Sequence, residues 1–404
     1  MRLEVWAPLP PARSGVADHV AEALPSLARR ADVSVVTEDP AHVDTAALGG
    51  VRLLSPAQSD GSAMRLYELG NSAFHGFVYR EAMRRPGVLR MHEWSLHSLV
   101  LSETHHRGDD EAYRSLMREA YGPAGSRVAT EVLCGAGTPL LHSIFPLSEH
   151  LVARSRAVAA TTAFTCSRAA AVRPGIPILH FPLHALPPSV PSRRDARVAL
   201  GLAPDAFLVT APGLVNPLKG LDVALKAAGR LRRQGMNLSF VVAGENTPRL
   251  PLEAWAREAG LEGAFSLTGR LPLGDLALHM AAADVLLALR FPSLGEMSAV
   301  LLRAMAMAQP VIVTAGTPLD VEFPADAVVA VDPGRHEEAE LTTLLSLLLR
   351  RPDLARRIGQ RARLHVEKHH DPDAIATRLV TFLESLPPDT VRAGGPPPRP
   401  RPRP

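Results

Sequence analysis

The second half of the chain alternates short apolar runs with helix-like segments, and this rhythm constrains the fold more than any other feature. Apolar runs of strand length lie at 207–213, 238–245, 264–270, 284–290, 310–314 and 327–331. Segments with helical periodicity separate most of them, at 221–235, 251–260, 273–283 and 298–308. Most of the runs are continuously apolar, as strands of a parallel sheet covered by helices on both faces require. The pattern predicts a doubly wound α/β domain.

The first half follows a similar rhythm with interruptions. A strand at 2–8, a helix at 16–30 and a strand at 33–37 open it, and a strand-like run covers 157–167. We therefore expect an α/β protein with two Rossmann-like doubly wound domains that face a cleft.

The domain boundaries are predicted from the linker and the tail. The N-terminal domain would cover 1–186, and the C-terminal domain would cover 187–386 and include the terminal helices. The segment 187–206 contains Pro and Arg and is typical of a linker. The Pro/Arg-rich stretch 387–404 predicts a disordered tail.

The composition excludes several classes of protein. A chain of 404 residues with 46% hydrophobic and 21% charged residues has the material for two folded cores. Its formal net charge of +3 is spread along the sequence and does not predict a nucleic-acid partner. Cys134 and Cys166 have no metal-ligand spacing, and no window is apolar enough to span a membrane. We expect a cytoplasmic protein, or one peripheral to the inner membrane.

The turn after the 207–213 run carries the first candidate site. Gly213 and Gly220 permit a tight turn, and a helix that starts near Leu221 would offer free N–H groups to a phosphate. Lys219 adds an ammonium group, and it is one of only three lysines in the chain. The spacing fits neither a P-loop nor G-x-G-x-x-G. An anion site and an ordinary strand-to-helix turn are both compatible with these residues.

Other polar residues stand where predicted strands end. Glu245, Arg270 and Arg290 close three successive strands of the second half, which favours a polar crevice for an anionic ligand. Scattered surface charge is the alternative. Gly15 follows the first strand of the chain and would let a ligand approach the backbone closely, although an ordinary turn also needs such a glycine.

His92 ends a predicted strand in the first half. It stands five residues before His97, so the pair does not have the HExxH spacing of zinc proteases. His92 either faces the crevice or is a satisfied structural histidine. The sequence has no nucleophile elbow and no close pair of carboxylates, so it favours a site that binds rather than attacks.

Taken in order, several stretches resemble the GT-B glycosyltransferases, in particular the retaining, family 4-like group that uses nucleotide-sugar donors. The resemblance rests on PLPPARSGVADH, YELGNSAFHGFVYREA, RPGVLRMHEWSLHSL, GLVNPLKGLDVALKAAGRL, VVAGE, LTGRLPLGDLALHMAAADVLLALR and RFPSLGEMSAVLLRAMAMAQPVIV. It implies a metal-independent, hexosyltransferase-like enzyme without a cofactor. The enzyme would transfer a sugar from a nucleoside-diphosphate sugar to a sugar, a glycolipid or another small acceptor.

The resemblance also implies roles for individual residues. It gives catalytic roles to His92, Lys219 and Glu296. It places twelve residues at the nucleotide sugar: Gly15, Gly213, Asn216, Lys219, Glu245, Gly269, Arg270, Leu271, Arg290, Gly295, Glu296 and Ser298. Asn71 and His75 would lie on the acceptor side, and no residue is assigned to a metal.

Two positions depart from the family pattern. Leu214 stands where the family usually has an arginine, and Arg303 replaces the second glutamate of its E-x7-E motif. Gly295 takes the place of the first glutamate, with Glu296 one residue beyond it. We predict that Glu296 is functional and that Arg303 is either a surface residue or a phosphate contact. The alternative function is a catalytically degenerate nucleotide-sugar-binding or scaffold protein, and a sugar-nucleotide epimerase ranks behind it.

Overall fold

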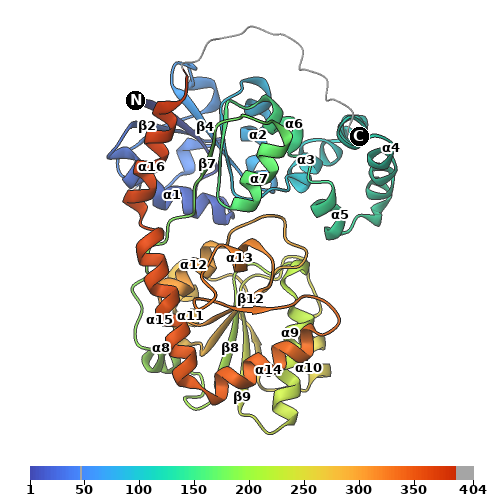
Figure 1. The fold of residues 1–404 in the computed structure, drawn as a ribbon, viewed down its shortest axis with the longest axis vertical. Coiled ribbons are helices and arrows are strands. Elements are labelled where there is room, and N and C mark those ends of the chain that lie inside the picture. The colour runs from blue at the N-terminus through green and yellow to red at the C-terminus, as the bar shows by residue number, and fades with distance from the viewer. Residues whose placement is uncertain (46–47, 388–404) are drawn as a thin grey trace. The chain divides into compact units, whose positions relative to one another are not determined.

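The computed structural model describes residues 1–45 and 48–387, which divide into two compact units (Figure 1). The first unit comprises Met1–Gly137, Ile144–Phe181 and the described residues from Asp373 onward. The second comprises Thr138–Ser143 and Pro182–Pro372. Apart from Pro387, the predicted tail at 387–404 lies outside the described residues.

A parallel sheet of seven strands forms the centre of the first unit, in the order β3-β2-β1-β4-β5-β6-β7. Its strands are β1 (Arg2–Trp6), β2 (Asp32–Val36), β3 (Arg52–Leu54), β4 (Met64–Leu69), β5 (Val88–Met91), β6 (Ala157–Ala160) and β7 (Ile178–His180). The order reverses between β1 and β4, because the chain builds outward from β1 first in one direction and then in the other. Loops that leave the carboxyl ends of β1 and β4 therefore diverge, and such a point is where open α/β sheets bind ligands.

Helices cover this sheet. On one face, α1 (Gly15–Ala28) and α16 (Pro372–Ser385) contribute Leu24, Leu27 and Leu379 to the same apolar core. Of three further helices, α2 (Gly76–Arg84) contacts β4, and α7 (Ala163–Val172) contacts β6 and β7. The third, α6 (Glu149–Arg154), contacts both α2 and α7. The remaining α-helices between β5 and β6 are α3 (His97–Glu103), α4 (Asp110–Glu131) and α5 (Pro139–Ile144).

The second unit has a six-stranded parallel sheet in the order β10-β9-β8-β11-β12-β13. Its strands are β8 (Phe207–Pro212), β9 (Leu238–Ala243), β10 (Phe265–Leu267), β11 (Val285–Ala288), β12 (Val311–Thr314) and β13 (Val329–Val331). All six apolar runs predicted as strands are therefore strands. The order reverses between β8 and β11, so the loops after these two strands border the ligand position expected for such a sheet.

Both faces of this second sheet are covered. One face packs against α9 (Leu221–Arg233), α10 (Leu252–Ala259) and α14 (Glu337–Arg350). The other core receives side chains from α11 (Leu273–Ala282), α12 (Ala299–Ala306), α13 (Pro318–Val321) and α15 (Pro352–His369). The short α8 (Arg193–Ala199) packs beside α11. The predicted class, two Rossmann-like doubly wound domains, is confirmed.

Three local predictions differ from the structure. The run 157–167 is a strand only to Ala160, because Thr162 accepts the N–H of Thr165 and begins α7. The segment predicted as a linker contains α8, which Ser192 caps. The sequence-based division at residue 186 groups the last helix with the second half, whereas α16 packs on the first unit. Helical periodicity shows that a helix has an apolar face but not which core receives it.

Candidate active site

The loop after β8 is fixed to its neighbour by the backbone. The N–H of Gly213 donates to the carbonyl of Ala243 at 2.9 Å, and the N–H of Val215 donates to that of Glu245 at 2.9 Å. Gly213 has a φ of +84°, which favours glycine. A Cβ on Gly244 would collide with the carbonyl oxygen of Gly213. These two glycines therefore allow the turns after β8 and β9 to pack against each other.

Lys219 is buried at the end of this loop. It closes the 3-10 helix η6 (Pro217–Lys219), which Asn216 caps by accepting the N–H of Leu218 at 3.0 Å. The Nζ of Lys219 donates to the carbonyl of Pro212 at 2.8 Å. Burial lowers the pKa of Lys219 well below its ordinary value, and the nearby charge of Arg290 lowers this pKa further. An anion bound here would favour the charged form of the amine.

Arg290 and Glu296 form an ion pair in the loop that follows β11. The Nε of Arg290 lies 3.3 Å from Oε1 of Glu296. The second oxygen of Glu296 accepts the N–H of Leu294 at 2.7 Å and the hydroxyl of Ser293 at 3.2 Å. Glu296 therefore holds both the guanidinium group and the turn around Gly295, whose φ is +84°.

The helix α12 begins directly after this loop. Ser298 caps α12 by accepting the N–H of Leu301 at 3.2 Å. A cavity of about 10 Å³, the space of roughly one water molecule, is lined by Lys219, Arg290 and Ser298 among others. Three of the side chains predicted to contact the nucleotide sugar thus converge on one place between β8 and β11.

Arg303 is buried on α12, with 7% of its surface exposed. The expectation of a surface residue is therefore wrong. The reason is that every residue of α12 from Leu301 to Ala306 is buried, so the helix has no solvent face at this position. The alternative expectation, a contact to the donor phosphate, stays a prediction.

The other predicted nucleotide-sugar residues follow β9 and β10 along the same edge of the sheet. Glu245 comes two residues after β9 and is half-buried. Gly269 has a φ of +71°, Arg270 is exposed, and Leu271 packs against the cluster of α8 and α11. These four residues lie in the loops after β9 and β10, which are on one side of β8, rather than at the reversal point between β8 and β11.

Strands β4 and β5 of the first unit end in a buried charged network that the sequence analysis did not find. Arg90 donates from Nη1 to Oε1 of Glu68 at 2.8 Å, and Nε2 of His92 lies 2.6 Å from Oε2 of the same carboxylate. Glu68 is fully buried, and Arg90 and His92 are 1% and 7% exposed. Arg90 also reaches Nε2 of His19 at 3.2 Å and lies 4.4 Å from the ring centroid of Phe181. Charged residues inside two central strands are the sequence signal that could have revealed it.

Burial and pairing act in opposite directions on this network. Burial raises the pKa of Glu68, but the charge of Arg90 and the hydrogen bonds from His92 and Arg90 outweigh it and leave that pKa below its ordinary value. Burial lowers the pKa of His92, although the bond to Glu68 opposes the shift. At neutral pH the carboxyl group is therefore ionised and the imidazole is neutral.

The predicted acceptor-side residues, Asn71 and His75, form hydrogen bonds near the ends of β4 and β5. Asn71 accepts the N–H of Leu99 on its side chain at 3.0 Å, and its own N–H donates to Oε1 of Glu93 at 2.8 Å. His75 ends the 3-10 helix η3 (Ala73–His75) and donates from Nδ1 to the carbonyl of Glu68 at 2.8 Å. Burial lowers the pKa of His75 to about 4. Their role toward an acceptor stays a prediction.

Gly15 begins α1, directly after the N-cap residue Ser14. A Cβ at Gly15 would meet no atom within 4 Å, so the backbone is open at this point. The predicted contact of Gly15 with the nucleotide sugar stays a prediction.

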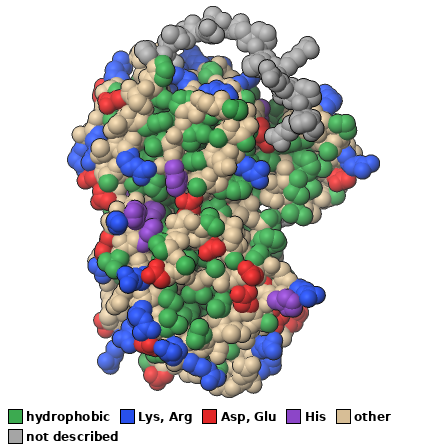
Figure 2. Space-filling model, viewed as in Figure 1, with side chains coloured by type: hydrophobic (Ala, Val, Ile, Leu, Met, Phe, Trp, Pro, Cys, Tyr) green, Lys and Arg blue, Asp and Glu red, His purple; other side chains and the backbone are tan. Residues whose placement is uncertain are grey.

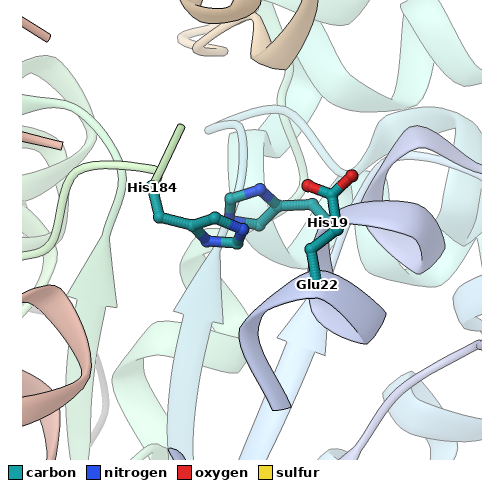
Figure 3. A group of neighbouring side chains, drawn as sticks. All are labelled: His19, Glu22 and His184. Carbon is teal, nitrogen blue, oxygen red and sulfur yellow. The ribbon is translucent and has the colours of Figure 1, made fainter. Parts of the chain in front are cut away.

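His19 and Glu22 lie one turn apart on α1, and Figure 3 shows their side chains on the same side of the helix. The third residue drawn there, His184, belongs to the second unit. Structural metal sites in proteins usually need four ligands, and catalytic ones need three. The two residues of α1 therefore do not by themselves define a metal site.

A larger hollow of about 510 Å³ lies elsewhere in the second unit. It is lined by the segment from Ala185 to Val190 and by residues of α12 and α15. None of the predicted site residues lines it. On the face drawn in Figure 2, basic and acidic side chains are interspersed. In the described part of the chain, no helix combines the length and apolarity needed to cross a membrane.

Comparison with known proteins identifies the second unit. Residues 192–365, which contain the turn of Lys219 and the loop of Glu296, match the family described as Glycosyl transferases group 1. This region is a group 1 glycosyltransferase domain. The match covers the six strands of the second sheet, so the family assignment and the strand order agree.

Curated relatives of this glycosyltransferase domain match over part of their length. A 2-deoxystreptamine glucosyltransferase from Streptomyces kanamyceticus is 37% identical over 84 residues, which are 21% of each chain. A D-inositol 3-phosphate glycosyltransferase from Actinosynnema mirum is 32% identical over 175 residues, or 40% of each chain. The chain therefore spans less than half the length of these relatives.

Solved structures match the chain over nearly its full length. Sucrose-phosphate synthase from Thermosynechococcus elongatus has a TM-score of 0.64 at 16% identity and covers 96% of this chain and 99% of its own. Anabaena HepE in complex with UDP and glucose has a TM-score of 0.66 at 15% identity, with coverage of 96% and 100%. At these identities the likeness establishes the fold, and the chain has the GT-B fold.

Proposed function

We propose that this protein is a retaining glycosyltransferase that moves a sugar from a nucleoside diphosphate to a sugar, a glycolipid or another small acceptor. One observation carries the proposal. The group 1 glycosyltransferase domain brings Lys219 and Arg290 together beside the reversal point of its sheet, and Glu296 restrains the arginine. A guanidinium group and a lysine amine that a bound anion would keep charged, both at the carboxyl ends of parallel strands, suit an anionic ligand such as a diphosphate.

The relatives are consistent with this substrate class. HepE, which shares the fold, was solved with UDP and glucose. The curated relatives are named as glycosyltransferases of 2-deoxystreptamine and of D-inositol 3-phosphate, which are polyhydroxylated acceptors. A hydroxyl group is therefore the proposed nucleophile of the acceptor.

The proposed reaction breaks the bond between the anomeric carbon and the diphosphate oxygen and forms a bond from that carbon to the acceptor oxygen. The acceptor proton passes to the departing diphosphate. Lys219 and Arg290 stabilise the negative charge that develops on this leaving group, because fixed cations in a partly buried site are already oriented toward it. His92 would contact the transferred sugar. The proposal includes no metal and no cofactor.

The test is donor turnover across UDP-, GDP- and ADP-sugars with a panel of acceptors. Wild-type protein should transfer or hydrolyse at least one donor. Lys219→Ala should lose at least about a hundredfold in kcat/KM, since one fixed group that stabilises a leaving charge is worth roughly 3 kcal/mol. Lys226→Ala is the matched control, because Lys226 is an exposed lysine of α9 and should not affect turnover.

A binding protein without catalysis is the second candidate. Leu214, which is 55% exposed on the loop after β8, supplies no charge at a position where the family pattern has one. If wild type binds a bare nucleotide but turns over no donor with any acceptor, the binding protein is the correct assignment.

A further inference from the structure

Both carboxylate oxygens of Glu68 have hydrogen-bond partners inside the first unit. One oxygen accepts from Arg90 and the other faces Nε2 of His92. A buried ion pair contributes little net stability once the desolvation of its charges is included. The second contact therefore suggests that Glu68 acts on His92 in addition to balancing Arg90.

The surroundings of His92 hold its ring in one place. The backbone N–H of His92 donates to the carbonyl of Leu69 at 3.0 Å, and the hydroxyl of Thr161 donates to the backbone carbonyl of His92 at 3.1 Å. The ring meets His19 edge-on, with centroids 5.9 Å apart. Because His92 follows β5 at the carboxyl edge of the sheet, this fixed ring lies where a parallel sheet binds its ligand.

The position of the proton on His92 follows from its partner. An ionised carboxylate only accepts hydrogen bonds, so Nε2 at 2.6 Å from Oε2 must carry a proton. The buried ring is neutral, since burial lowers its pKa. A neutral imidazole with its proton on Nε2 has a lone pair on Nδ1, and Nδ1 is then an acceptor.

We propose that Glu68 is a positioning residue for glycosyl transfer, which holds His92 with its proton on Nε2 so that Nδ1 accepts a hydrogen bond from a hydroxyl group of the transferred sugar. This inference rests on the proposed function. Arg90 supports it by keeping the carboxylate ionised, and its contacts with His19 and Phe181 hold the guanidinium group in place.

The variant Glu68→Gln tests which nitrogen of His92 carries the proton. Arg90 can only donate, so it takes the amide oxygen of the new side chain and turns the amide NH2 toward Nε2 of His92. The imidazole must then accept at Nε2 and carry its proton on Nδ1. The change is nearly isosteric, yet it inverts the tautomer that the sugar hydroxyl would meet.

The first measurement is ¹⁵N NMR of the full-length protein labelled at histidine, with His92→Gln used to assign the His92 signals. Wild type should show a protonated Nε2 and an unprotonated Nδ1 at neutral pH, and Glu68→Gln should show the reverse. A wild-type proton on Nδ1 would overturn the inference. This measurement needs no substrate, so it stands apart from whether the protein transfers a sugar.

The second measurement is steady-state transfer. Glu68→Gln should lower kcat at least about tenfold while the Kd for the bare nucleotide changes less than twofold. In a His92→Ala background the same change should have less than a twofold effect on kcat, because Glu68 acts through His92. Additive losses would show that Glu68 acts independently of His92 and would overturn the inference.

Matched variants separate this role from stability. Glu81→Gln changes another buried carboxylate of the first unit, which pairs with Arg84 and Arg85, and should leave kcat unchanged. Glu68→Gln combined with Arg90→Met frees the amide oxygen to face His92 and should recover part of kcat. If the double variant folds and is no faster than Glu68→Gln, the tautomer argument is wrong. A wild type without transfer would instead remove the proposed function and leave the NMR result valid.

Discussion

Glu296 is the residue on which the loop after β11 depends. It pairs with Arg290 and accepts from Leu294, so its carboxylate both shapes the loop and places a cation. Glu296→Gln keeps the shape of the side chain but removes the charge. We expect transfer to fall at least about tenfold, or roughly 1.4 kcal/mol of transition-state stabilisation.

The measurement is kcat/KM for the best donor. Glu253→Gln, an exposed change at the start of α10, should have no effect and controls for surface charge. If Glu296→Gln has the kcat/KM of the wild type, the charge of this carboxylate does not contribute to transfer and its role is only structural.

The lowered pKa of His75 should make the stability of the first unit depend on pH. Its pKa is about 4 in the folded protein against an ordinary value of 6.5, so the unfolded chain binds more protons between these values. The contribution of His75 to stability is fully present above pH 6.5 and is lost as pH falls from there toward 4. Between pH 7 and pH 5 it should lower the free energy of unfolding by about 2 kcal/mol.

Urea unfolding at the two pH values tests this effect. Replacing Trp255 by Phe leaves Trp6 and Trp94 as fluorescence reporters, both in the first unit. Between pH 7 and pH 5, the free energy of unfolding of His75→Gln in this background should fall by about 2 kcal/mol less than that of the parent. The other buried histidines are present in both proteins and contribute the same pH dependence to each. His106→Gln, an exposed change, should keep the parental slope. Equal slopes for His75→Gln and parent would contradict the argument.

At the scale of elements, α16 is the helix whose placement matters most. Its apolar face, with Leu379 fully buried, completes the core beneath β1 and β2 of the first unit. Leu379→Ala should therefore destabilise the first unit by about 2–5 kcal/mol, the range for a truncated core leucine.

The same fluorescence reporters measure this loss by urea unfolding. Leu347→Ala on α14 is the matched control, because Leu347 is exposed and belongs to the second unit. A Leu379→Ala protein as stable as the parent would show that α16 adds little to that core.

Most elements follow from local patterns in the sequence. The six strands of the second sheet are predicted correctly because most of them are continuous apolar runs, which a sheet buried on both faces requires. The strand predicted through residue 167 ends early because the side chain of Thr162 accepts the N–H of Thr165 and so begins a helix. The end of an element depends on such capping contacts, and apolar periodicity does not contain them.

At the scale of the whole molecule, two sheets with the same reversal of strand order occur in one chain. Only the second lies in the group 1 match, so we expect bare nucleotide to stabilise the second unit. In a protein with Trp6 and Trp94 replaced by Phe, Trp255 reports the second unit alone. Saturating UDP, GDP or ADP should raise the melting temperature seen by Trp255, and Lys219→Ala should reduce that shift.

A shift that persists in Lys219→Ala would mean that the nucleotide binds without this lysine. Lys226→Ala serves as the control here too, because it removes an exposed lysine from the same unit.

Part of the candidate site, like part of the fold, can be predicted from the sequence. The residues around Lys219 and Glu296 stand at the ends of predicted strands, and parallel strands bring those ends to one edge, so the sequence alone could place them together. The family pattern singled out His92 but not the groups that orient it.

The two α/β halves, their parallel strands and the glycines and charges at the strand ends follow from the sequence alone, because those features are periodic and local. Three features appear only in the folded protein: α16 packs on the first unit, Arg303 is buried, and Glu68 contacts both Arg90 and His92. Each of these depends on contacts between residues far apart along the chain. Burial and hydrogen bonding at such contacts set the charge and the proton position of a side chain, and neither can be derived from the residue's neighbours in sequence.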